Sequence, residues 1–127
     1  MKTKLFTISI AAFALTLFAE DFGSIGLVIV DRKRDGEPLR TGVVSPGSPA
    51  ERAGIKPNGF LISVDGTNVV SMSLTRSMSF MRGPIGTEMT LELADSTLSH
   101  TNKFTVTRKR AVFSGYGADM KVEFFDH

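Results

Sequence analysis

Residues 45–66 read SPGSPAERAGIKPNGFLISVDG, and this stretch decides the fold. It begins with the signals of a short helix: Ser48 is a typical N-cap, Pro49 suits the first helical position, and Glu51 completes the spacing of a capping box. Gly54 then stops the helix after about one and a half turns. The apolar residues that follow, and the Asp-Gly pair after them, predict a strand and a tight turn.

Further strands are expected on both sides of this stretch. Leu27–Val30 is short, apolar and rich in β-branched residues. Two segments of the C-terminal half alternate polar and apolar residues with period two, which is typical of antiparallel strands with one buried face. The expected strands are 27–30, 41–45, 60–64, 67–70, 88–93 and 103–107.

A longer helix is expected at 73–82. Ser73 is a capping residue, and Gly83-Pro84 ends the helix. Its apolar side chains form a stripe facing the core: Leu74, Met78 and Met81 at helical spacing, widened by Phe80. These elements predict a mostly β (α+β) fold, a small and partly open antiparallel β-barrel or sandwich capped by two helices.

The first 19 residues have the layout of a secretory signal peptide. Lys2 and Lys4 precede an apolar run at 5–18, and Ala19 precedes acidic residues. We expect export to the periplasm or the medium, no stable membrane anchor after cleavage, one domain at 20–113, and a tail at 114–127 that either adds a strand or is mobile. A retained signal is the alternative, and whether it is cleaved stays open.

Charge and cysteine content exclude several classes of function. The chain has 15 basic and 13 acidic residues, and removal of Lys2 and Lys4 leaves the rest formally neutral. This argues against a nucleic-acid partner, so the clusters Arg32-Lys33-Arg34 and Arg108-Lys109-Arg110 are interpreted as solvated surfaces. With no cysteine, the chain has no disulfide, thiolate metal site or redox chemistry.

No constellation of residues predicts catalysis. His100 and His127 lack further metal-ligand residues at suitable spacing. The acidic residues Asp31, Asp35 and Glu37 suit a solvated turn, and no serine lies in a nucleophile-elbow pattern. We therefore expect a protein that is not an enzyme and that uses neither a cofactor nor a metal.

The order of these motifs resembles the PDZ domain. The resemblance covers roughly 23–110 and is strongest to the bacterial type found in C-terminal processing peptidases, without their protease domain. The matching motifs are GSPAERAGI at 47–55, SVDG at 63–66 and the Arg82-Gly83 turn. One departure is Pro57-Asn58-Gly59, where the family usually has Pro-Gly-Asp. Because Asn tolerates a left-handed backbone, we expect the turn to survive.

The resemblance implies a site for the C-terminal end of a peptide. The backbone N–H groups of Ile25, Gly26 and Leu27 would bind the terminal carboxylate, and the strand at 27–30 would pair with the peptide beside the 73–82 helix. The predicted groove residues are Val28, Ile29, Val30, Leu74, Met78 and Met81. Leu74 and Met78 imply an apolar third-from-last ligand residue, and Ile25, Leu27, Ile29 and Met81 imply an apolar last residue.

The sequence therefore predicts an exported, non-catalytic module that captures C-terminal peptides with apolar ends from envelope or secreted proteins. A separate protease is a further candidate partner, for which the module would act as an adaptor. The alternative is a regulatory subunit or truncated fragment of a C-terminal processing serine peptidase. A third hypothesis places the tail, Met120–His127, in its own groove or in that of a neighbouring molecule. The ligand's identity and the oligomeric state stay open.

Overall fold

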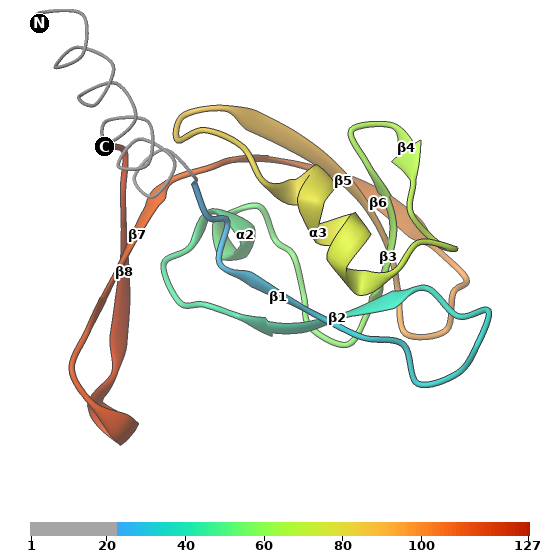
Figure 1. Cartoon of the computed structure of the whole chain (residues 1–127), viewed down its shortest axis with the longest axis horizontal. Coiled ribbons are helices and arrows are strands. Elements are labelled where there is room, and N and C mark those ends of the chain that lie inside the picture. The colour runs from blue at the N-terminus through green and yellow to red at the C-terminus, as the bar shows by residue number, and fades with distance from the viewer. Residues whose placement is uncertain (1–22) are drawn as a thin grey trace, which may run out of the picture.

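The computed structural model describes residues 23–127, so the expected signal peptide lies outside the described residues. Within this range the chain forms one antiparallel sheet, two short α-helices and a separate hairpin (Figure 1). No helix in this range is long and apolar enough to cross a membrane. The elements are β1 Leu27–Val30, β2 Leu39–Val44, α2 Pro49–Arg52, β3 Phe60–Val64, β4 Thr67–Asn68, α3 Leu74–Met81, β5 Glu88–Ala94, β6 Thr101–Thr107, β7 Arg110–Ser114, a 3₁₀ turn Gly117–Asp119, and β8 Lys121–Phe125.

The sheet has the order β1-β2-β3-β5-β6, with β4 paired to β3, and all its pairs are antiparallel. Among the described strands β6 does not pair along its length with β1, so the predicted mostly β, partly open architecture is confirmed. One isolated bridge, between Ser24 and Lys109, joins the two ends of the sheet. Strand β1 is consequently an edge strand, and α3 packs against it.

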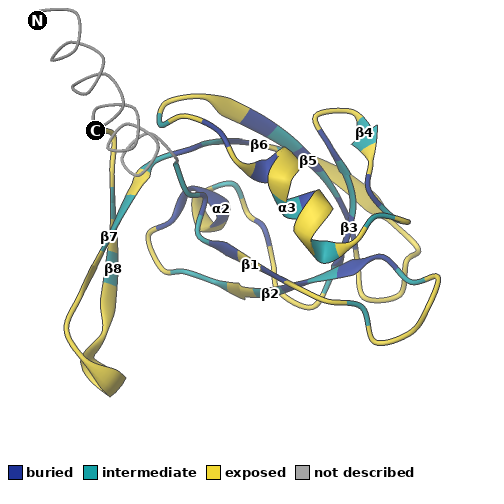
Figure 2. Cartoon of the chain, viewed as in Figure 1, coloured by how far each residue is buried: buried dark blue, intermediate teal, exposed yellow. Residues whose placement is uncertain are grey.

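The core lies between the inner face of this sheet and the helices (Figure 2). Side chains alternate along a strand, so Leu27 and Ile29 of β1 are buried while Val28 and Val30 are 49% and 46% exposed. Met89 and Leu91 of β5 fill the centre of the core. Burial of this apolar face is what fixes the register of β1 against β2.

Helix α2 begins at the predicted N-cap, but the predicted capping box is shifted by one residue. The Ser48 side chain accepts a hydrogen bond from the Glu51 N–H (3.1 Å), and Pro49 occupies the first turn. Glu51 bonds the N–H of Gly47 (2.9 Å), so the capping-box carboxylate reaches one residue beyond the N-cap. Gly54 follows with φ +89°, as a helix stop requires.

Helix α3 begins after the predicted N-cap, Ser73, whose side chain accepts from the Arg76 N–H (3.1 Å). Met81 is buried, and Leu74 and Met78 are partly buried against the core. The prediction that Phe80 widens the core stripe is wrong, because its side chain is 36% exposed. Ser77 is buried instead of Phe80. It lies three residues after Leu74, and residues at this spacing share one face of a helix, so Ser77 lies within the apolar stripe.

The C-terminal residues form a two-stranded hairpin, β7–β8, in which Arg110 pairs with Phe125 and Ser114 with Lys121. Residues 121–125 therefore add a strand, which lies along β7. They do not lie along β1 of the same chain, so the version of the third hypothesis that places the tail in its own groove is wrong, and the version with a neighbour's groove stays a prediction. Figure 1 shows the turn of the hairpin projecting away from the sheet, and Figure 2 shows that most of it is exposed.

Candidate functional site

The segment Ser24–Leu27, here called the glycine loop, leads into the edge strand β1. Gly26 has φ +77°, a backbone conformation that residues other than glycine rarely adopt. A Cβ on Gly26 would lie 2.2 Å from Ser48 Cβ and 2.9 Å from Phe124 Cζ. The loop therefore needs glycine here both for its backbone conformation and for the space that Ser48 and Phe124 occupy.

The first three carbonyl groups of the glycine loop are bound by the protein. Ser24 O accepts from the Lys109 N–H (2.9 Å), Ile25 O from the Ala50 N–H (2.9 Å), and Gly26 O from the Ser45 N–H (2.8 Å). In a trans peptide unit the N–H points opposite to the C=O. The N–H groups that follow, those of Ile25, Gly26 and Leu27, therefore point away from these partners.

These N–H groups are also little used within the protein. The Gly26 N–H makes a 3.2 Å bond to the Ser24 hydroxyl. The Ile25 N–H makes no hydrogen bond to another residue within 23–127. Consecutive N–H groups in a glycine-containing turn are donors suited to an anion such as a carboxylate.

A buried arginine, Arg108, packs against Gly23, the residue that precedes the glycine loop. Arg108 is only 5% exposed, and its side chain donates to Met81 O (3.1 Å), Thr87 Oγ1 (2.9 Å) and Glu88 O (3.3 Å). Its guanidinium fills the space where a Gly83 Cβ would lie, with atoms 2.7–2.9 Å away. It forms no salt bridge with any other described residue.

The interpretation of Arg108 as part of a solvated basic cluster is therefore wrong. Neutral carbonyl and hydroxyl oxygens satisfy the guanidinium, so its positive charge stays uncompensated by a carboxylate at this end of α3. The basic run itself gave no sign of this. The only signal was its position two residues after the buried Val106 of β6, on the inward side of the alternation.

The predicted groove residues come together in the structure. Ile25, Leu27, Ile29 and Met81 belong to one buried cluster, and Leu74 and Met78 pack against it from α3. The side chains of Val28 and Val30 face the other way, so these two residues can contribute only backbone groups on the α3 side. The binding roles assigned to all of these residues remain predictions.

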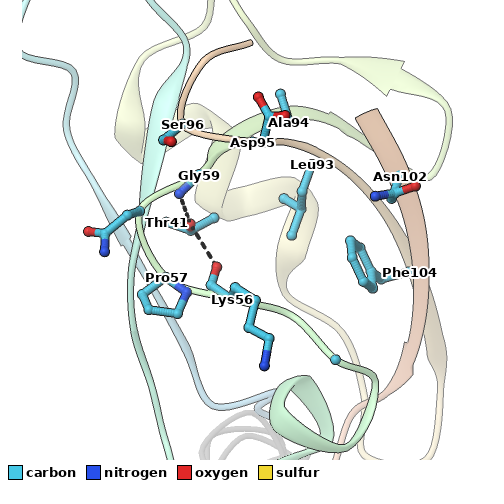
Figure 3. Close-up of a pocket in the computed structure, with 12 residues that line it drawn as sticks. Thr41, Lys56, Pro57, Gly59, Leu93, Ala94, Asp95, Ser96, Asn102 and Phe104 are labelled. Carbon is cyan, nitrogen blue, oxygen red and sulfur yellow. Dashed lines mark hydrogen bonds between the residues drawn. The ribbon is translucent and has the colours of Figure 1, made fainter. Parts of the chain in front are cut away.

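A cavity of about 360 Å³ lies elsewhere, between the 56–59 turn and strands β5 and β6 (Figure 3). It contains none of the predicted site residues. Figure 3 shows Thr41 Oγ1 holding the turn, accepting from the Gly59 N–H (2.8 Å) and donating to Lys56 O (3.2 Å). Asn58 has φ +66°, which confirms that the departure from the family pattern at this turn keeps the left-handed backbone.

Asp95, at the rim of this cavity, is expected to have a pKa below the usual value of an aspartate. Hydrogen bonds from the Thr97 hydroxyl, the Ser99 N–H and His100 lower its pKa from 3.8 to about 2. Because the pKa is depressed by folding, this stabilisation of the 95–100 loop is complete above pH 3.8 and is lost as the pH falls through 2. An NMR titration of the carboxyl carbon measures it, and Thr97→Val should raise the midpoint; a midpoint near 3.8 in the wild type would contradict the loop geometry.

Comparison with known proteins gives a consistent result. The family pattern of the PDZ domain matches residues 40–95. The carboxyl-terminal-processing protease of Synechocystis sp. is 34% identical over 74 residues, which cover 58% of this chain and 17% of that protein. Carboxy-terminal processing protease CtpA of Bacillus subtilis is 43% identical over 74 residues, covering 57% of this chain and 15% of that protein.

Among solved structures, the PDZ domain of a carboxy-terminal protease from Vibrio cholerae, in complex with peptide, superposes with a TM-score of 0.58. It is 20% identical, and the match covers 70% of this chain and 94% of that one. At this identity the superposition establishes the fold alone. This chain spans only 17% and 15% of the two curated relatives.

Proposed function

Because this chain carries a PDZ domain related to those of carboxyl-terminal processing proteases, we propose that it binds the C-terminal ends of other proteins by adding them as a strand to β1. The observation that carries the proposal is the glycine loop, whose first three carbonyls are bound by the protein while the N–H groups of Ile25, Gly26 and Leu27 point away. Those N–H groups bind the terminal carboxylate of the ligand.

The buried charge of Arg108 supports the same assignment. Its backbone packs against Gly23, the residue before the glycine loop, and its guanidinium packs against Gly83 at the end of α3. A cation that is shielded from water and lacks a carboxylate partner attracts an anion more strongly than an exposed one. We assign it a long-range role, adding to the hydrogen bonds that the loop donates.

The free edge of β1 supports strand addition. Main-chain hydrogen bonds from Leu27–Val30 bind the peptide with little regard to its sequence, and pockets beside α3 select its side chains. Leu74 and Met78 select an apolar third-from-last residue. The last residue enters among Ile25, Leu27, Ile29 and Met81, and because these side chains are buried in the free protein, the flexible Met81 moves to admit it.

The experiment that tests this proposal is an NMR titration with a peptide ending in two apolar residues. Backbone amide shifts are expected at 25–30 and along α3. The opposite sheet edge, β6, is an internal control, because it is also an unpaired strand edge but has no glycine loop leading into it, and it contacts the short helix α2. Shifts confined to β6, or spread evenly over both edges, would contradict the proposed site.

Leu74→Asp is expected to weaken peptide binding about tenfold, since it places a charge in an apolar pocket. Thr75→Asp is the matched control: Thr75 is exposed in the same first turn of α3, so both substitutions add an acidic residue where the helix dipole favours one. Calorimetry measures both affinities. Equal losses in the two variants, or no loss in Leu74→Asp, would count against the groove assignment.

In the cell we propose an exported protein that presents envelope or secreted proteins to a separate protease. The processing proteases among its relatives favour this partner class, and they equally favour the alternative of a regulatory piece of such a peptidase. Purification from the native source distinguishes the two. An adaptor dissociates from the protease when peptide is removed, whereas a regulatory subunit co-purifies in fixed stoichiometry.

A further inference from the structure

One face of the β7–β8 hairpin is apolar and ends at the glycine loop. Pairing of Ala111 with Phe124 and of Phe113 with Val122 places these four side chains on the same face. Phe113, toward the turn, is 68% exposed. Phe124, at the other end, is partly buried, and its Cζ lies 2.9 Å from where a Gly26 Cβ would be. The ring of Phe124 therefore covers the α-carbon of Gly26.

Two further contacts join the hairpin to the glycine loop at the same end. Ser24 and Lys109 exchange a pair of backbone hydrogen bonds, Ser24 N–H to Lys109 O (2.7 Å) and Lys109 N–H to Ser24 O (2.9 Å). The Lys109 ammonium then pairs with Asp126, just after β8 (2.8 Å). Both strands of the hairpin are thus fixed near the residue that begins the loop.

The hairpin depends on these contacts for its own position. A two-stranded ribbon is marginally stable in water by itself, and the turn projects away from the sheet (Figure 1). The glycine loop in turn takes a backbone conformation that needs support, with φ +77° at Gly26. A displacement of Phe124 removes one of the two side chains nearest to this glycine, Ser48 being the other.

We propose that Phe124 is a positioning residue for peptide binding, through which the β7–β8 hairpin holds the glycine loop in its carboxylate-binding conformation. The inference rests on the proposed function, and it gives the hairpin a role that the PDZ domain match at 40–95 does not include. Coupling between two sites is reciprocal, so a bound peptide also stabilises the hairpin against opening.

The test compares Phe124→Ala with Phe113→Ala, which removes the same side chain from the same apolar face, further along the hairpin toward its turn. Peptide affinity, measured by calorimetry on the whole chain, should fall at least about fivefold for Phe124→Ala and change less than about twofold for Phe113→Ala. Phe124→Leu, which refills most of the space beside Gly26, should recover most of the affinity. Equal affinities for the wild type and Phe124→Ala would overturn the inference.

Two readouts separate positioning from a general loss of stability. In the free protein, Phe124→Ala should shift the amide resonances of Ile25 and Gly26 and leave those of the β5 core unchanged. Peptide should slow hydrogen exchange at Phe124 in the wild type. If no peptide binds the wild type, the proposed function fails, and the free-protein shifts still decide whether Phe124 positions the loop: unchanged Ile25 and Gly26 resonances overturn that role.

Discussion

Replacing Gly26 by alanine is expected to lower the free energy of unfolding by about 2–4 kcal/mol and to abolish detectable peptide binding. The backbone cost comes from φ +77°, and the steric cost from Ser48 Cβ, which would lie 2.2 Å from the new methyl group. Relief of the clash must move either the loop or α2, and either movement redirects the N–H groups of Ile25, Gly26 and Leu27. Chemical denaturation and calorimetry measure the two effects.

Gly36→Ala is the control for this substitution. Gly36 has φ +87°, but nothing lies within 4 Å of a Cβ placed on it. It should therefore lose about 1 kcal/mol from the backbone conformation alone and bind peptide as the wild type does. If Gly26→Ala and Gly36→Ala lost equal stability and bound peptide equally well, the close contact between Gly26 and Ser48 would not affect peptide binding.

Replacing Arg108 by methionine is expected to lower the free energy of unfolding by about 2–3 kcal/mol, which is large for a domain of this size. Methionine keeps much of the buried volume between Gly23 and Gly83. It cannot donate hydrogen bonds, so the oxygens of Met81, Thr87 and Glu88 lose their partner at the junction of α3, β5 and β6. Denaturant unfolding of both proteins gives the difference.

Two further variants are controls for Arg108→Met. Arg110→Met removes an exposed arginine two residues away and should change stability by no more than about 0.5 kcal/mol. Arg108→Lys keeps the charge but not the planar set of donors, so it should lose stability while retaining more peptide affinity than Arg108→Met. A fully stable Arg108→Met protein would show that these hydrogen bonds contribute nothing net.

The elements that local chemistry specifies were predictable from the sequence. The N-caps of α2 and α3, the glycine after α2 and the alternation in β5 and β6 each involve neighbouring residues only, and all are present in the structure. The family resemblance drew attention to Gly26, but its contacts with Ser48 and Phe124 could not be predicted, because they come from residues far along the chain.

The features that depend on distant contacts were missed. In the sequence, Arg108 is one of three consecutive basic residues, which is typical of a solvated surface. Its side chain is buried because it follows the end of β6 on the side of the strand that faces inward. The position of Phe80 beside the apolar stripe of α3 predicts a partly buried side chain. In the structure Phe80 is exposed, and Ser77 is the residue that α3 buries. The apolar residues of the tail suit either a strand or a mobile end, and no pattern in the sequence predicts β7, the strand with which the tail pairs.

The central claim, recognition of a free C-terminal carboxylate by the glycine loop, is tested most directly with pairs of peptides that differ only in a free or amidated C-terminus. The account predicts binding of free acids with apolar last residues and at least about tenfold weaker binding of the matching amides. Equal affinity for acid and amide, or no binding of either at millimolar peptide, would contradict it.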